Sequence, residues 1–166
     1  MKRSLEHYRT REAACEWLHK RGVRVEDIAE LVLLLQGDYI QGLEMKHCIR
    51  SVERVLAKRE VQNAILTGIQ MDIFAEERKL ASPLQEIIEY DEGLYGCDEI
   101  LSLSITNVYG SIGMTNFGYI DKIKPGILKR LNDKEDGEIH TFLDDIVGAI
   151  AAAASSRIAH SRFSVR

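Results

Sequence analysis

The sequence predicts an all-α protein, and three observations support that prediction. Apolar residues make up 45% of the 166-residue chain and charged residues 29%, which is ordinary for a globular domain. Only two prolines interrupt a sequence rich in Ala, Leu, Ile, Glu and Lys. Apolar residues recur at spacings of three and four, and no segment alternates as a strand would. We therefore expect a multihelical bundle without a sheet.

The first half of the chain reads as a series of amphipathic helices. Gly22 is expected to end the first of them, because glycine readily takes the left-handed conformation that closes a helix. The fourth helix either continues the third or follows a short break. The expected helices cover residues 4–21, 26–39, 44–58 and 60–79.

The second half begins with a strong helix signal. Ser82 is expected as the N-cap and Pro83 as the first helical residue of a short helix that ends near Tyr90. A glycine-bearing loop then leads to a helix that starts at Asp98. Because this helix contains several glycines, it must either pack closely on a neighbour or break. A further helical stretch covers residues 127–131.

The last helix is expected over residues 141–160, with Thr141 as its cap. Residues 146–154 are small or apolar on every side, which is typical of a helix buried at the centre of a bundle. The length of the chain favours one domain over 1–166. Within it we expect N-terminal amphipathic helices (1–59), a core (60–160) and a basic tail (161–166).

The charge distribution argues against nucleic acid as a ligand. The net charge is −4, and residues 61–156 carry 7 Lys/Arg against 16 Asp/Glu. A phosphate backbone needs a basic footprint, whereas an acidic centre suits metal cations. The odd cysteine count, and the lack of a signal peptide or an apolar run of bilayer length, predict a cytoplasmic protein without a transmembrane span. Its other expected setting is the periphery of a membrane, which the basic tail could touch.

Acidic residues against apolar sequence are the most informative feature of the second half. A carboxylate next to buried sequence is costly unless a positive group shares its site. The lysine between the acidic pairs is a candidate for such a group. The candidate site residues are Asp98, Glu99, Asp121, Lys124, Asp144 and Asp145.

Each of these residues also has a purely structural explanation. Thr141 and Asp144 have the spacing of a capping box, and Asp121 and Lys124 have that of an i,i+3 ion pair. The pair at Asp98 stands at a helix start, where acids suit the helix dipole. Asp145 is harder to explain in this way, because a second adjacent carboxylate adds little to a cap and repels the first.

The set as a whole suits Mg²⁺ and a phosphate group. Magnesium takes oxygen ligands and keeps waters and substrate oxygens around it. A lysine supplies a point charge for the phosphate. A carboxylate that is not a ligand can take a proton from an attacking water.

Three motifs in this order resemble the phosphatidylglycerophosphatase A family. They are Asp91-x-Gly93-x-x-x-x-Asp98-Glu99, Ile120-Asp121-x-x-Lys124-Pro125 and Asp144-Asp145-Ile146-Val147-x-Ala149. The resemblance extends over roughly residues 58–159 and is closest to the soluble branch of low-temperature-requirement C proteins.

The resemblance implies a multihelical fold with a buried central helix and a Mg²⁺-dependent phosphatase. The substrate would be phosphatidylglycerophosphate, cleaved to phosphatidylglycerol and phosphate, or a related phosphate monoester of phospholipid metabolism. Asp98, Glu99, Asp121, Asp144 and Asp145 would hold the metal, and Lys124 would contact the substrate phosphate.

Two other functions stay open at this point. An all-α nucleotide pyrophosphohydrolase also gathers acids around magnesium, and Glu86-x-x-Glu89 is the nearest match to its motif. A non-catalytic helical module is the second, with residues 1–59 as its partner-binding face. Self-association as a homo-oligomer is expected for either enzyme, because small-residue and amphipathic helices offer close-packing faces.

Overall fold

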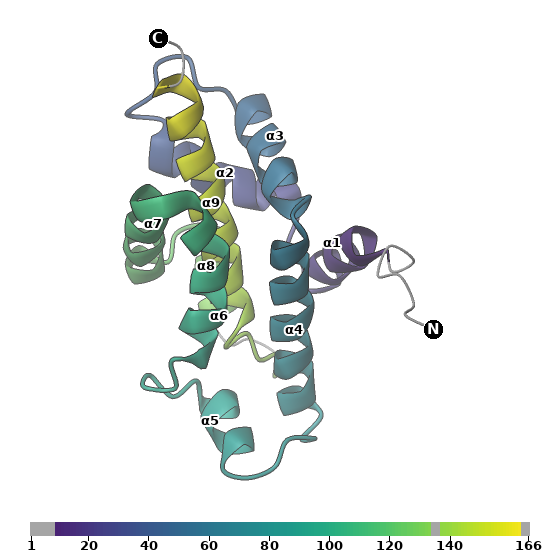
Figure 1. Ribbon diagram of the computed structural model, residues 1–166. Helices are drawn as coiled ribbons and strands as arrows, with labels where there is room; N and C mark the ends of the chain where they lie inside the picture. Colours follow the sequence, from purple (N-terminus) through teal and green to yellow (C-terminus); the bar gives the residue numbers. More distant parts are fainter. Residues whose placement is uncertain (1–8, 134–136, 164–166) are drawn as a thin grey trace.

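The computed structural model describes residues 9–133 and 137–163, with side chains up to Ser161. The described residues form α-helices, one 3₁₀ turn and loops, without a strand, and this confirms the all-α prediction. Figure 1 shows their arrangement. The helices are α1 (Thr10–Lys20), α2 (Val25–Gln36), α3 (Met45–Leu56), α4 (Arg59–Glu76), α5 (Leu84–Tyr90), α6 (Cys97–Thr106), α7 (Gly110–Ile123), α8 (Ile127–Asn132) and α9 (Leu143–Phe163).

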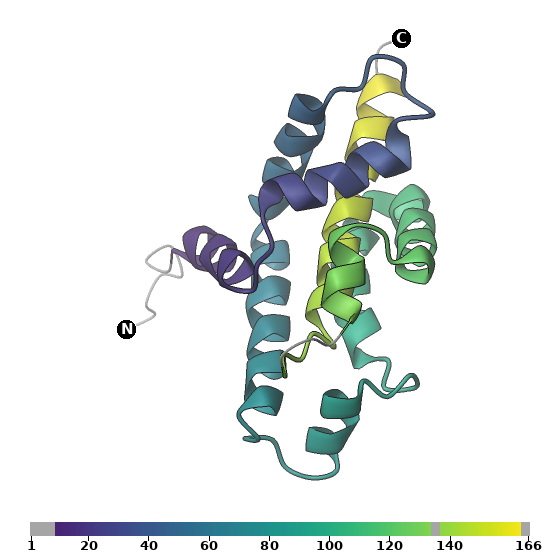
Figure 2. The same ribbon diagram turned by 180° about the vertical axis from the view of Figure 1, so that it is seen from behind.

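Helix α9 lies at the centre of the bundle, as the run of small residues predicts. Its residues from Leu143 to Ser156 are buried, and α2, α3, α4, α6, α7 and α8 all pack against it. Figures 1 and 2 show it running through the middle of the molecule, with α4 along one side. Alanines at 149 and 151–154 allow the surrounding helices to approach closely.

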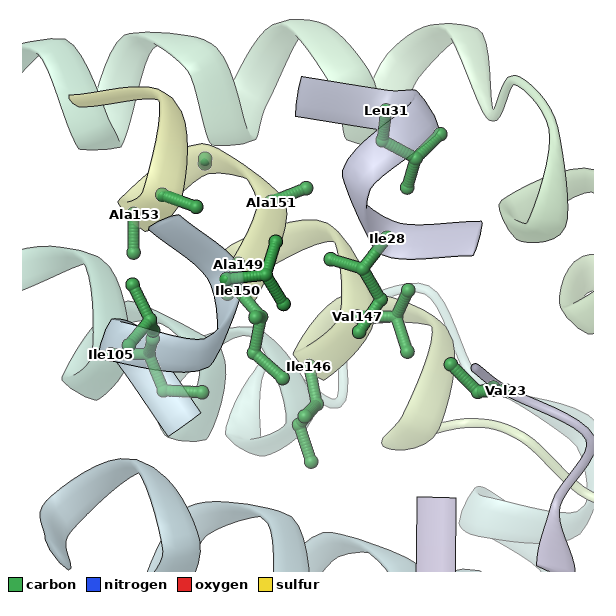
Figure 3. Close-up of a cluster of buried hydrophobic side chains, with 14 of the residues drawn as sticks. Val23, Ile28, Leu31, Ile105, Ile146, Val147, Ala149, Ile150, Ala151 and Ala153 are labelled. Carbon is green, nitrogen blue, oxygen red and sulfur yellow. The ribbon is translucent and has the colours of Figure 1, made fainter. Parts of the chain in front are cut away.

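The core joins α9 to both halves of the chain. Ile146, Val147 and Ile150 are fully buried, and they lie among Ile28 of α2 and Ile105 of α6 in Figure 3. Burial of one such side chain contributes about 1.5–3 kcal/mol. The N-terminal helices are therefore part of the same core as the later helices.

Helix α4 lies close to α9 at Gly68. A Cβ atom added at Gly68 would overlap Cδ1 of Ile146 and lie 3.0 Å from Cβ of Phe142. At Gly148 of α9, by contrast, the nearest atom would be 3.6 Å away, which is an ordinary contact. A larger residue at position 68 would thus require the Ile146 side chain to move.

Several helix boundaries differ from the predictions. Helices α3 and α4 are separate, because Lys58 is extended between them. Helix α6 ends before its glycines: a 3₁₀ turn at Asn107–Tyr109 and a positive φ of 71° at Gly110 separate it from α7. Of the two alternatives for this region, the break is the correct one. Residues 1–8, with the expected start of the first helix, and residues 164–166 of the basic tail lie outside the described part of the chain.

The expected cap of α5 is wrong by one residue. Pro83 occupies the N-cap, and no side chain caps it. The Ser82 hydroxyl instead donates a hydrogen bond of 2.6 Å to Oε1 of Glu86. The Ser82 side chain therefore hydrogen-bonds to a carboxylate in the first turn of α5 and does not accept a backbone N–H.

None of the helices in the described ranges 9–133 and 137–163 is long and apolar enough to cross a membrane.

Candidate functional site

A cavity of about 160 Å³ opens where the ends of four helices meet the loop after α5. Asp98 and Glu99 begin α6, Lys124 follows α7, and Asp144 and Asp145 begin α9. All six candidate residues line this one cavity, although 47 residues separate the first from the last. The complete lining is Asp91, Glu92, Gly93, Gly96, Asp98, Glu99, Asp121, Lys124, Asn132, Thr141, Asp144 and Asp145.

Lys124 joins carboxylates from two helices. Its Nζ atom lies 2.6 Å from Oδ1 of Asp121, 2.7 Å from Oδ2 of Asp144 and 3.6 Å from Oδ1 of Asp145. The residue has a φ of 43°, in the left-handed region that a lysine rarely adopts, at the point where α7 ends. The i,i+3 pair with Asp121 is thus present, but it is only one part of a larger cluster.

The charges in this cluster strongly affect one another. Burial opposes the charged form of Lys124, but Asp144, Asp121 and Asp145 outweigh it and raise the pKa of the amine. Burial raises the pKa of Asp144 to about 6 in spite of Lys124. Burial and then the charge of Asp144 raise the pKa of Asp145 to about 9. One lysine therefore does not neutralise the carboxylates around it.

Asp98 and Glu99 differ in their surroundings. Asp98 is buried, and its Oδ1 atom has no hydrogen-bond partner among the described residues. Burial raises the pKa of this carboxyl. Glu99 is exposed at the edge of the cavity. A buried oxygen without a partner is rare in folded proteins, and it leaves Asp98 able to accept a ligand.

A buried aspartate from α4 holds the start of α9. The carboxylate of Asp72 accepts the N–H groups of Phe142 and Leu143, both at 3.0 Å. Asp72 is fully buried, so these bonds are shielded from water. The two N–H groups at the start of α9 lack helical partners, and Asp72 supplies them from 70 residues away. This contact fixes the backbone immediately before Asp144 and Asp145.

The expected capping box of Thr141 and Asp144 is wrong. The Thr141 hydroxyl donates a 2.7 Å hydrogen bond to the carbonyl oxygen of Ile88 in α5, so it ties two distant segments together. Asp144 accepts hydrogen bonds from Lys124 and from the backbone N–H of Asp145. Because Asp72 caps the start of α9, neither Thr141 nor Asp144 is needed as a cap, and both are available to the cavity.

The segment before α9 is clamped by Arg21, at the end of α1. This buried guanidinium donates to both carboxylate oxygens of Glu76 at 3.0 and 2.6 Å and to the carbonyl of Ile139 at 2.8 Å. It also lies 3.1 Å from Nδ1 of His140. Glu76 in turn accepts the N–H of Ile139 at 2.7 Å. The N-terminal region therefore helps to position the N-terminal end of α9.

A model of the family described as "PgpA: Phosphatidylglycerophosphatase A" matches residues 17–160. The chain belongs to the phosphatidylglycerophosphatase A family. This match begins well before residue 58, where the resemblance was expected to start. The family model thus covers the end of α1 and all of α2 and α3.

Relatives and solved structures agree with this membership. The uncharacterized protein YutG of Bacillus subtilis is 67% identical over 143 residues, which are 86% of each chain. The crystal structure of the low temperature requirement C protein from Listeria monocytogenes has a TM-score of 0.92 and 63% identity, covering 95% of this chain and 99% of that one. The crystal structure of ypjQ from Bacillus subtilis has a TM-score of 0.91 and 51% sequence identity, covering 99% of this chain and 100% of that one. Membership of the phosphatidylglycerophosphatase A family indicates an activity of the phosphatase type.

Four lining residues with polar side chains were not among the predicted site residues. Asp91 and Glu92 precede Asp98 in an acidic loop, and this local excess of charge is a signal that could have found them. Asn132 and Thr141 carry no such signal, because only the fold brings them to the cavity. Glu86 and Glu89, the possible pyrophosphohydrolase motif, do not line the cavity and bind Ser82 and Arg78 instead.

The cavity fits a divalent cation in its chemistry without forming a closed cage. Its acidic side chains offer hard oxygen donors, and the free Oδ1 of Asp98 and the repulsion between Asp144 and Asp145 are both relieved by a cation. No three acidic, histidine or cysteine side chains of the described chain surround a single point as metal ligands do. This arrangement suits an ion that keeps waters and binds substrate oxygens.

Proposed function

We propose that this protein is a Mg²⁺-dependent phosphatase that hydrolyses phosphatidylglycerophosphate or a related phosphate monoester of phospholipid metabolism. Family membership supports the type of reaction, and the acidic cavity supports a site where a metal and a phosphate meet. The metal would be held by residues from Asp98, Glu99, Asp121, Asp144 and Asp145. We also propose that the enzyme is a homo-oligomer and meets its lipid substrate at a membrane surface.

The position of Lys124 carries the proposal. An ammonium group has three N–H donors, and Asp121 and Asp144 accept two of them. The third donor remains for a phosphoryl oxygen. Because the two carboxylates hold the amine in place before substrate arrives, little reorganisation is needed when negative charge develops on the phosphoryl group.

We propose direct attack by water, with an aspartyl-phosphate route as the alternative. A water oxygen forms a bond to phosphorus while the bond from phosphorus to the ester oxygen breaks. A cavity carboxylate accepts the proton of the water, and the departing alcohol oxygen takes up a proton. Lys124 neutralises charge on the phosphoryl oxygens throughout. Magnesium, when bound, would polarise these oxygens and lower the pKa of the water.

Phosphate release from short-chain phosphatidylglycerophosphate, with Mg²⁺ and then with EDTA, tests the proposal. Soluble phosphate monoesters and nucleoside triphosphates are assayed beside it. Release from the lipid that requires Mg²⁺ is expected. Release of pyrophosphate and a nucleoside monophosphate from the nucleotides alone would instead favour the pyrophosphohydrolase. No release from any compound, together with an unchanged melting temperature on adding Mg²⁺, would favour a non-catalytic module.

The variants Asp144→Asn and Asp145→Asn test the site itself. Each is expected to abolish turnover and to reduce the Mg²⁺-dependent rise in melting temperature while helicity is kept. Asp133→Asn is the matched control, because Asp133 is exposed and outside the cavity. Full activity in both site variants would contradict the assignment.

A further inference from the structure

A second cavity, of about 290 Å³, lies between α3 and α9. We name it the α3–α9 pocket. Basic and polar side chains make up most of its lining, with Leu43 and Ile158 as its apolar wall. The basic and polar members are His47, Arg50, Arg54, Arg157 and Ser161.

Helical periodicity directs these side chains to one place. His47, Arg50 and Arg54 have the spacing i, i+3 and i+7, so they form one stripe along α3. Arg157 and Ser161 have the spacing i,i+4 and form the facing stripe on α9. Figure 1 shows the two helices side by side at the end of the molecule where α9 ends.

The two walls are held in a fixed relation. The buried Ser51 hydroxyl of α3 donates a 2.9 Å hydrogen bond to the carbonyl oxygen of Ala154 in α9. Cys48, Val52 and Val55, on the same helix, are fully buried. The arginines therefore project from a rigid frame, which lowers the entropic cost of binding a ligand.

Acidic side chains in the described part of the chain do not balance the charges of this pocket. Arg50, Arg54 and Arg157 form no ion pair with any acidic residue in the described ranges, and no acidic side chain lines the pocket. Like charges at i,i+4, such as Arg50 and Arg54, cost an isolated helix about 0.2–0.5 kcal/mol. A bound anion would relieve this repulsion.

We propose that the α3–α9 pocket binds a phosphorylated anion. Guanidinium groups from two helices match the geometry of phosphate oxygens, to which arginine donates paired hydrogen bonds. The ligand is either a free phosphate compound or the headgroup of an anionic phospholipid, which share this chemistry. Arg157 lies 13 residues beyond Asp144 on α9, or about 20 Å along the helix, so this pocket is separate from the acidic cavity.

The test measures binding of two probes in EDTA, so that metal-assisted binding at the acidic cavity is suppressed. One probe is inorganic pyrophosphate, followed by calorimetry. The other is vesicles of phosphatidylglycerol in phosphatidylcholine, followed by co-sedimentation, with pure phosphatidylcholine vesicles as the reference. Arg50→Gln and Arg157→Gln are each expected to weaken binding about tenfold or more.

Two control variants isolate the pocket. Arg11→Gln removes the same charge from an exposed position on α1 that lines none of the described cavities. Lys124→Gln removes the cation of the acidic cavity, so any pyrophosphate binding that it lowers is assigned to that cavity and not to the α3–α9 pocket. Arg11→Gln is expected to bind both probes like the wild type. Arg54 is left unchanged, because it lies in the last turn of α3 and also stabilises the helix end.

The outcomes decide both the site and its ligand. Binding of pyrophosphate alone would identify a free phosphate compound, and binding of the anionic vesicles alone a lipid headgroup, provided that Arg50→Gln weakens it. Arg50→Gln is also expected to keep or raise the melting temperature without ligand, which a structural arginine would not do. Equal binding by all variants, or no binding of either probe, would overturn the proposal.

Discussion

The Nζ atom of Lys124 lies 2.7 Å from Oδ2 of Asp144 and so joins the end of α7 to the start of α9. Asp121, one turn earlier in α7, lies 2.6 Å from the same nitrogen. The amine is three-quarters buried and shared between two carboxylates. Its position is therefore set by the fold rather than by solvent, and its removal affects a specific point of the cavity.

Replacement of Lys124 by glutamine is expected to lower kcat/KM for phosphate release about 10²-fold, because a fixed donor to the phosphoryl group is lost. Lys122→Gln is the matched control, since Lys122 is exposed two residues earlier. Steady-state kinetics of both variants provide the measurement. Equal activities of the two variants would contradict the role of Lys124.

Asp72→Asn is expected to lower the free energy of unfolding by about 1–3 kcal/mol. The carboxylate accepts two backbone N–H groups, whereas an amide would turn its own NH₂ donor toward one of them. Urea unfolding measures the change. Glu77→Gln serves as control, because the exposed pair of Glu77 with Lys79 should change the free energy by less than about 0.5 kcal/mol.

The contribution of His140 to stability is expected to fall as the pH is lowered from about 6.5. Burial, followed by the charge of Arg21, lowers the pKa of His140 from its reference value of 6.5. In this range the unfolded chain takes up a proton on His140 that the folded protein resists, so acid favours unfolding. The contribution of His140 to stability is complete above pH 6.5. It is lost as the pH falls through the pKa of His140 in the folded protein.

Glu76 adds to the loss of stability at lower pH. Burial opposes its ionisation, but Arg21 and the N–H of Ile139 outweigh it and lower its pKa below 4.5. Urea unfolding between pH 8 and about 3 tests both residues, with the Glu76 contribution lost below about pH 4.5. His140→Gln should flatten the upper part of the profile, and replacement of the exposed His19 should not. An identical slope in all three proteins would contradict this account.

Gly68→Ala and Gly148→Ala are expected to have opposite effects. Alanine is favoured over glycine inside a helix by about 1 kcal/mol, and Gly148 has room for the added methyl. At Gly68 the methyl would press on Ile146 and Phe142, at a cost of about 1–3 kcal/mol. Thermal unfolding of both variants provides the comparison. A Gly68→Ala protein as stable as Gly148→Ala would show that α4 and α9 separate easily.

Much of the helix pattern was predictable because helices follow local rules. The period of apolar residues located all of the main helices, and the small residues at 146–154 predicted the central helix. The caps were less predictable. Asp72 displaces Thr141 as the partner of the α9 N-terminus, and a contact that spans 70 residues leaves no local signal.

The candidate site was likewise predictable only in part. Acidic residues next to buried sequence identified Asp98, Asp144 and Asp145, because such placement is costly without a reason. Asn132 and Thr141 reach the cavity only through the folding of α8 and the segment before α9. The sequence placed Lys124 and Asp144 in one candidate site, but it did not predict their direct contact, since Asp121 is also an i,i+3 partner of the lysine.

The clamp formed by Arg21 has a practical consequence for dissecting the protein. A fragment that starts at residue 60 would retain every acidic residue of the cavity and yet lose the guanidinium that holds Ile139 and His140. It would also leave Glu76 without its partner and strip α2 and α3 from one side of α9. The smallest autonomous unit that keeps this cavity in shape must therefore include α1, and trimming from the N-terminus should stop before Thr10.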